Sequence, residues 1–306
     1  MVVLTGMMKI VVGLALGFFF RRIKLLNKES TNSLSKLTLN AACPCLIFSS
    51  IVGMDSSHKE DVGLLMIVGV AIYIFLAVVG IIASKLLAGK DKGAFYMILS
   101  LILFGQVGFM GFPLAEAFYG ELGVSYMGIL NIHFTVFMFT IGIYLISKSA
   151  GKTGKFNPMK MINSSTVGIV LAVILFFLDV KVPDVIMAPI DFIGQLMSPL
   201  AMIIVGSTLA TYSFKEMFSN WRYYVIAILR LIIMPAIAFV VLHALYGTSA
   251  LTIISTISIG VPPAATVTMM AITYGGDHKT ASLASGLTTV MSIITIPLLW
   301  LFMNSL

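Results

Sequence analysis

The chain has 306 residues, of which 59% are hydrophobic and only 10% charged, and its formal net charge is +7. Soluble domains carry about 25% charged residues, so this composition excludes a soluble globular protein and indicates one that crosses a membrane several times. The basic residues fall in short loops between apolar runs. The positive charge therefore gives no indication of a nucleic-acid partner.

Apolar runs long enough to cross the hydrocarbon layer, about 20 residues each, recur along the whole chain. Separated by turn residues and charges, they predict ten transmembrane helices. In chain order the predicted spans are about 2–20, 33–53, 62–84, 94–118, 123–147, 162–180, 185–211, 223–246, 250–274 and 280–303. The fold class predicted from the sequence is an all-α membrane protein embedded in a lipid bilayer.

The distribution of basic residues predicts the orientation of these spans. Of the 19 Lys and Arg residues, Lys9, Lys36 and Arg230 lie within predicted spans, and Lys59 and Lys181 lie in loops after even-numbered spans. This leaves 14 in loops after odd-numbered spans. Because basic loops stay in the cytoplasm, the odd loops are predicted inside and both termini outside, with the protein in the cell membrane.

A basic loop over 148–160 divides the chain into two halves of five spans each, 1–150 and 151–306. Five is an odd number, so the halves run in opposite directions through the membrane, as an inverted repeat requires. Sequence echoes support the repeat. Asn40 precedes a proline by four residues in the second span, and Gln195 does so in the seventh.

The most informative feature is a helix-breaking cluster near the middle of the fourth span and another in the ninth. The first contains Gly108, Gly111 and Pro113, and the second contains Gly260 and Pro262 followed by a second proline. Proline removes a backbone donor, and broken helices persist in membranes only where they are buried in protein or line a cavity. Paired breaks in two repeats indicate the binding site of a transporter. The alternative is that the prolines only kink two helices for packing.

Each break starts a new helical segment, whose positive N-terminal end suits an anionic group such as a carboxylate. Gln106 and Thr266 beside the breaks either bind the substrate or satisfy the freed backbone. The amides at positions 40 and 195 are placed to reach a break or the ligand. The predicted substrate-binding residues are Asn40, Gln106, Gly108, Gly111, Pro113, Gln195, Gly260, Pro262, Pro263 and Thr266.

Charged and titratable residues within the spans are few and therefore informative. Arg230 in the eighth span either attracts the anion or closes an ion pair, or it snorkels or holds exposed carbonyls near a proline. His133 in the fifth span is a candidate proton relay, or a helix–helix hydrogen-bonding residue. Lys9 is predicted near mid-depth. The sequence has no nucleotide-binding loop, metal-ligand cluster or catalytic constellation, so neither an enzyme nor a cofactor is predicted; coupling to Na⁺ or H⁺ is left open.

The segment 108–114 followed by Tyr119-Gly120-Glu121 is similar to the fourth span of the auxin efflux carrier family, which includes bacterial malate and malonate permeases. Pro199 to Leu209 resembles the seventh span of that family, and 260–264 with 274–277 and 284–298 resembles the last two. The resemblance implies crossing broken helices four and nine, a scaffold bundle (spans one, two, six and seven), a transport bundle (spans three to five and eight to ten) and a homodimer. This sequence differs from the family at Gln106 and Thr266, where many members have Asn.

These observations favour a secondary transporter of small organic anions, for example malate- or malonate-like carboxylates, that works by elevator-like alternating access. Two alternatives remain open at this stage. One is a sodium-coupled symporter of larger organic anions, resembling bile-acid carriers. The other is a ligand-binding membrane sensor that transports nothing.

Overall fold

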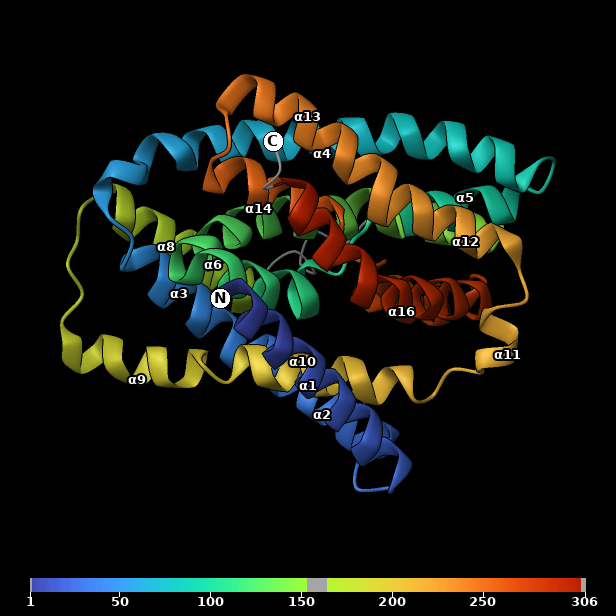
Figure 1. Ribbon diagram of the computed structural model, residues 1–306, viewed down its shortest axis with the longest axis horizontal. Coiled ribbons are helices and arrows are strands. Elements are labelled where there is room, and N and C mark those ends of the chain that lie inside the picture. Colours follow the sequence, from blue (N-terminus) through green and yellow to red (C-terminus); the bar gives the residue numbers. More distant parts are fainter. Residues whose placement is uncertain (1, 153–163, 304–306) are drawn as a thin grey trace. The chain divides into compact units, whose positions relative to one another are not determined.

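The computed structural model describes residues 2–152 and 164–303 (Figure 1). That part of the chain is mainly helical and contains no strand, which confirms the all-α fold class. Residues 153–160 of the basic loop predicted over 148–160, and the predicted start of the sixth span, lie outside the described residues. The α-helices are α1 (Val2–Arg22), α2 (Lys28–Leu37), α3 (Cys43–Val52), α4 (Lys59–Ala88), α5 (Lys92–Leu103), α6 (Phe112–Phe137), α7 (Ile143–Ser149), α8 (Ser164–Phe177), α9 (Asp184–Gly194), α10 (Met197–Leu209), α11 (Phe214–Met217), α12 (Trp221–Ile228), α13 (Met234–Tyr246), α14 (Ala250–Ile259), α15 (Ala265–Tyr274) and α16 (His278–Met303).

Six helical stretches in the described residues are long and apolar enough to cross a membrane. They are Lys28–Val52, Ser56–Ala88, Val107–Ser149, Asp184–Leu209, Trp221–Tyr246 and His278–Met303. The longest of them contains a turn, because Tyr119 and Gly120 leave the helical conformation inside α6. Gly120 has φ 56°, a left-handed conformation that glycine adopts without steric cost.

Short π-helical turns precede three of the prolines within helices. Thr38–Ala42 (η1) lies just before Pro44, Val107–Gly111 (η3) just before Pro113, and Leu229–Ile233 (η6) just before Pro235. A proline inside a helix cannot donate its backbone hydrogen bond, and a π-turn is one way to accommodate the lost partner. The turn η6 matters for function because it contains Arg230.

The described chain forms two compact units. Unit 1 consists of Met1–Met66, Val107–Ile132 and Ile162–Thr211. Unit 2 consists of the described residues within Ile67–Gln106, His133–Met161 and Tyr212–Leu306. Each unit therefore contains residues from both halves of the chain.

In unit 1, helices α1 and α10 cross in close contact (Figure 1). A methyl group added at Gly17 would overlap the carbonyl of Ile203, and one added at Gly206 would overlap the carbonyl of Leu14. At Gly13 the added carbon would lie 2.6 Å from Cβ of Met202. Small residues let helix backbones approach closely in membranes, and here they pack α1 and α10 against each other.

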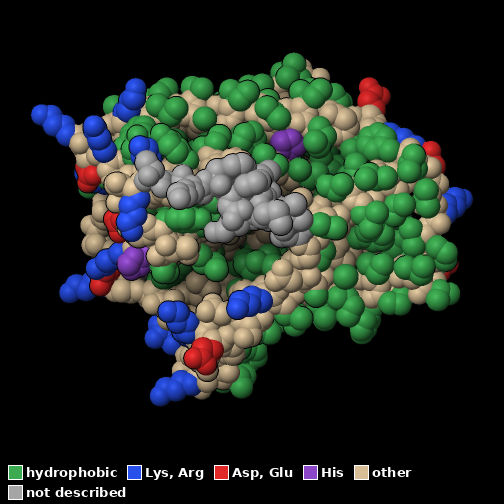
Figure 2. Space-filling view, turned by 180° about the vertical axis from the view of Figure 1, so that it is seen from behind, with side chains coloured by type: hydrophobic (Ala, Val, Ile, Leu, Met, Phe, Trp, Pro, Cys, Tyr) green, Lys and Arg blue, Asp and Glu red, His purple; other side chains and the backbone are tan. Residues whose placement is uncertain are grey.

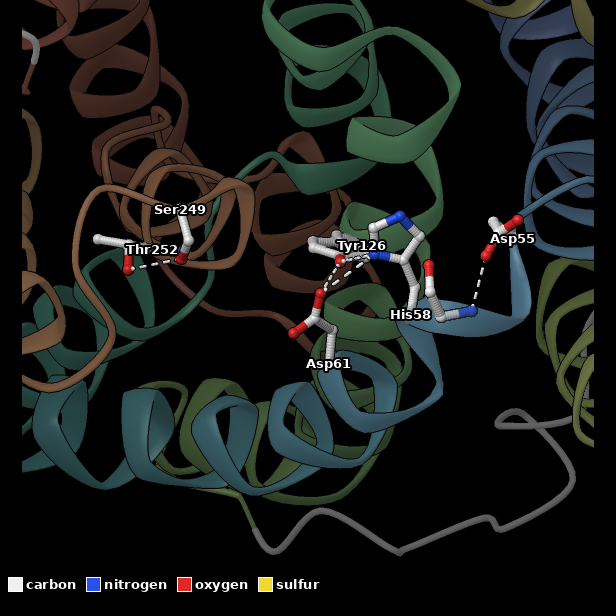
Figure 3. Close-up of polar contacts among 7 residues, drawn as sticks. Asp55, His58, Asp61, Tyr126, Ser249 and Thr252 are labelled. Atoms are coloured by element: carbon white, nitrogen blue, oxygen red, sulfur yellow. Dashed lines mark hydrogen bonds and ion pairs between the residues drawn. The ribbon is translucent and has the colours of Figure 1, made fainter.

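A polar cluster in unit 1 joins the start of α4 to α6 (Figure 3). The hydroxyl of Tyr126 donates to Asp61 Oδ2 and lies 3.0 Å from Nδ1 of His58. Asp55 caps the short helical turn that follows it, because its carboxylate accepts from the backbone N–H of Ser57 at 2.8 Å. These contacts fix the N-terminal end of α4.

In unit 2, α4 presents an apolar stripe to its surroundings. Ile67, Val70, Ile74 and Val78 are all exposed and follow one another at three- or four-residue steps. Figure 2 shows hydrophobic side chains over much of the face it draws. An exposed face this apolar is the surface that a helix presents to lipid.

Candidate functional site

Two non-helical segments of unit 2 pair with each other. The chain leaves the helical conformation between α5 and Val107, and again between α14 and α15. Gly105 and Pro263 form an isolated antiparallel bridge. It is flanked by two hydrogen bonds, from the Gln106 N–H to the Pro262 carbonyl at 2.8 Å and from the Ala264 N–H to the Phe104 carbonyl at 2.9 Å. We call Phe104–Gln106 with Gly260–Ala264 the crossing. Its backbone groups satisfy each other, as a buried break inside hydrocarbon requires.

The sequence of the crossing explains this pairing. Pro262 and Pro263 have no backbone N–H, so they cannot continue the hydrogen bonds of α14. Gly105 permits the close approach, since a methyl group there would overlap Nη2 of Arg230 and lie 2.8 Å from Cγ2 of Val261. On the other side, the Phe104 ring is fully buried among Tyr73 and Phe134. The glycine, the prolines and the aromatic anchor together fix the backbone here.

The buried side chain of Arg230 donates to one carbonyl in the crossing and to one near the end of α5. Its side chain is 0% exposed. Its Nε donates to the carbonyl of Val261 at 2.7 Å, and its Nη1 donates to the carbonyl of Ile102. Nη2 has no hydrogen-bond partner, and no carboxylate pairs with the guanidinium in the described part of the chain. The crossing is therefore a buried, positively charged centre.

Gln106 links the crossing to the N-terminus of α15. Its Oε1 accepts the backbone N–H of Ala265 at 2.9 Å and so caps the helix. Among the described residues its Nε2 makes no hydrogen bond, and neither does the hydroxyl of the half-buried Thr266. These donors lie at the positive end of a helix dipole, where an anionic group is stabilised.

The other predicted residues of unit 2 have different surroundings. Gly260 packs near Leu299 and Pro235, where an added methyl group would lie 3.0 Å and 3.4 Å from side-chain carbons. His133 is 5% exposed, and Gly69 of α4 packs directly against its ring. The relay role of His133 stays a prediction.

Three of the predicted residues in unit 1 are engaged in local packing. Asn40 donates from Nδ2 to the Lys36 carbonyl at 2.8 Å, and its Oδ1 accepts from Ser164 at 3.2 Å. A methyl group added at Gly108 would lie 3.7 Å from Cδ2 of Leu39, and one added at Gly111 would lie 3.2 Å from the sulfur of Met127. These contacts indicate no ligand.

Pro113 and Gln195 line a cavity of about 900 Å³ that lies within unit 1, between α1, α6 and α10. Three polar residues that sequence reasoning did not assign to the binding site line the same cavity, namely Lys9, Glu116 and Ser198. Ser198 Oγ donates to Glu116 Oε2, and Nε2 of Gln195 donates to Asp191 at 2.8 Å. The signal that could have found this cavity is Lys9, the one charged residue of α1 before Arg21 and Arg22 at its C-terminal end.

No cluster of three or more His, Cys, Asp or Glu residues suited to a metal ion occurs in residues 2–152 and 164–303. Cys43 and Cys45 are free thiols in α3. The polar groups of both regions are hydrogen-bond donors and isolated charges, which suit binding rather than covalent chemistry.

Long apolar helices, an internal break with a buried cation and a sizeable cavity define a multi-pass membrane transporter rather than an enzyme. The chain belongs to the membrane transport protein family, whose model matches residues 2–165 and 153–300. This confirms the resemblance to the auxin efflux carriers.

The relatives give the same class without a substrate. The uncharacterized transporter YfdV of Escherichia coli K12 is 26% identical over 98% of this chain and 97% of its own length. An uncharacterized transporter of Methanocaldococcus jannaschii is 24% identical over 94% of this chain and 95% of its own length. One of Methanothermobacter thermautotrophicus is 21% identical over 95% of each chain.

Proposed function

We propose that this protein is a secondary transporter of small organic anions, of the carboxylate class that includes malate and malonate. The observation that carries the proposal is Arg230, a fully buried cation that bonds to Val261 in the crossing and to Ile102 near the end of α5, and that has no carboxylate partner in the described chain. A positive centre in low dielectric attracts an anion strongly. The donors Gln106 Nε2 and Thr266 Oγ1 at the start of α15 would bind the carboxylate oxygens.

We further propose that the chain crosses the cell membrane ten times, as two inverted five-span repeats with both termini outside. On this reading α5 and the helix after the crossing form the broken fourth span, and α14 and α15 form the broken ninth. The turn at Tyr119–Gly120 then separates the fourth span from the fifth. Broken helices of this kind mark the binding site in inverted-repeat transporters.

Transport would proceed by an elevator-like movement of a transport bundle (spans three to five and eight to ten) against a scaffold bundle (spans one, two, six and seven), within a homodimer. The helices α1, α2, α3, α8, α9 and α10, which correspond to the proposed scaffold spans, all belong to unit 1. Most of the remaining spans belong to unit 2, although Val107–Ile132 belongs to unit 1.

The experiment is uptake of radiolabelled malate and malonate into liposomes containing the purified protein. We expect saturable uptake that falls at least about tenfold in Thr266→Val, which removes one hydroxyl donor, and in Pro262→Ala. Thr273→Val is the matched control, because the exposed Thr273 hydroxyl on the same helix bonds only to the Met269 carbonyl. Absence of uptake in sodium and in potassium buffers alike would contradict the proposal and favour a sensor. Uptake that requires sodium would favour a symporter.

A further inference from the structure

The cavity of unit 1 contains two opposite charges that are not paired with each other. Lys9 is the eighth of the 21 residues of α1, and every other lining residue contributed by that helix is apolar. Glu116 lies on α6 and also lines the cavity. In the described residues Lys9 has no hydrogen bond or ion pair, and Glu116 has only the hydrogen bond from Ser198.

An unpaired ammonium and an unpaired carboxylate are costly within a membrane-spanning protein, where charged side chains normally pair or face a binding site. Lys9 and Glu116 face the same space of about 900 Å³, which lies within the range of small-molecule sites. A water molecule occupies only about 30 Å³, so the cavity has room for a ligand as well as solvent. A ligand with two opposite charges would neutralise both side chains at once.

The polar groups of the cavity define what such a ligand carries. Lys9 offers only donors, so it takes a carboxylate. Glu116 keeps Oε1 free while Ser198 occupies Oε2, so it takes an ammonium group. The rest of the lining is mainly apolar, with Ile10, Leu16 and Met202 among its members, and suits an aliphatic side chain.

We propose that this cavity binds zwitterionic amino acids, with the carboxylate on Lys9 and the ammonium group on Glu116. Glu116 repels a second carboxylate, so the cavity disfavours dicarboxylates. Binding stands independently of transport; only the identification of the bound amino acid as a transported substrate rests on the proposed function.

The test measures ligand-induced stabilisation of the purified full-length protein in detergent, since a ligand raises the unfolding temperature by mass action. The probes are glycine, L-leucine and L-glutamine, each compared with the matched acid and the matched amine. For leucine these are 4-methylpentanoate and 3-methylbutylamine. We expect at least one amino acid to bind at least about tenfold more tightly than both of its matched compounds, as the loss of one charged hydrogen bond implies. If no amino acid exceeds its matched acid and amine, the proposal is overturned, and this comparison needs no variant.

Two variants then assign the groups. Glu116→Gln keeps an acceptor for Ser198 and should lose the preference for leucine over 4-methylpentanoate, while the affinity for the acid is unchanged or tighter. Lys9→Met should weaken the binding of both leucine and 4-methylpentanoate by at least about tenfold, and should leave the binding of the amine unchanged. Lys36→Met, which changes an exposed lysine that does not line the cavity, is the control. A preference that persists in Glu116→Gln would overturn the assignment.

Uptake into liposomes separates this inference from the proposed function. Amino-acid binding without uptake of any amino acid, malate or malonate would support the site and contradict transport. Uptake of malonate, with no amino acid bound more tightly than its matched acid and amine, would support transport and overturn the site.

Discussion

The crossing in unit 2 and the cavity in unit 1 handle polar groups in opposite ways. In the crossing, backbone groups and the Arg230 side chain are buried and bond to one another. In the cavity, Lys9 and Glu116 face open space and do not pair. The difference teaches that the crossing is held together by internal hydrogen bonds, whereas Lys9 and Glu116 form no ion pair in the described chain. Substitutions that remove the buried hydrogen bonds of the crossing should therefore destabilise the fold, whereas substitutions of Lys9 and Glu116 should change ligand affinity with little effect on stability.

The largest effect is expected for Arg230→Met, which leaves the carbonyls of Ile102 and Val261 without their donor. Two buried carbonyls losing charged hydrogen bonds should lower the free energy of unfolding by about 2–4 kcal/mol. Thermal unfolding in detergent measures it. Arg222→Met, a half-buried arginine whose side chain makes no hydrogen bond or ion pair in the described chain, is the control and should change little. Equal effects of the two substitutions would refute the assigned role.

The next largest decrease in stability is expected for Gly105→Ala, because its methyl group would overlap Nη2 of Arg230. Overpacking of this kind costs about 1–3 kcal/mol. Gly108→Ala is the matched control, because its methyl group would approach only Leu39, at 3.7 Å. The measurement compares the unfolding temperatures of the two variants. A larger decrease in the unfolding temperature of the control would show that the crossing accommodates an added methyl group that its geometry excludes.

The cavity should respond in the other direction. Lys9→Met and Glu116→Gln each remove an unpaired charge, so without ligand we expect the free energy of unfolding to stay constant or rise by up to about 1 kcal/mol. Thermal unfolding of the ligand-free variants checks this. A marked destabilisation by either substitution would mean that the charge stabilises the fold, and the contrast with the crossing would be lost.

The smallest effect concerns Asp55, which lies in neither region. Its hydrogen bonds from Ser57 lower the pKa of the carboxyl below the ordinary value of 3.8. A lowered pKa in the folded state stabilises the protein above the unfolded pKa and loses that contribution as pH falls through the folded one. Asp55→Asn keeps the capping acceptor without titrating. The unfolding temperature of the wild type relative to this variant should therefore decline between about pH 6 and pH 3, and a constant difference would contradict the cause given.

Local chemistry made part of this predictable. Pro262 and Pro263 lack a backbone N–H, and Gly105 lacks a side chain, so residue type favours non-helical backbone and close approach at these positions. The hydropathy of the long runs likewise predicts the all-α fold. The sequence alone did not predict which residue each polar side chain would contact. Arg230 had several candidate roles, and only the fold brings it to the carbonyls of Ile102 and Val261.

The cavity was harder to predict for the same reason. Lys9 and Glu116 are more than 100 positions apart and belong to helices that neither periodicity nor charge pairs with each other. Asn40 and Gln195 looked equivalent because each precedes a proline by four residues. The structure gives them different surroundings: Asn40 bonds to Lys36 and Ser164, whereas Gln195 lines the cavity. A shared sequence pattern specifies shared backbone chemistry, not shared contacts.

The most direct test of the central claim, that the crossing presents donors to a carboxylate, is uptake of labelled malonate by Gln106→Glu in liposomes. Glutamate has the same shape and keeps an oxygen to accept the Ala265 N–H, so the fold should be retained, while a negative oxygen replaces the free Nε2 donor. The account predicts an unchanged unfolding temperature and uptake reduced at least about tenfold relative to the wild type. Uptake equal to that of the wild type, in a variant that unfolds at the same temperature, would contradict it.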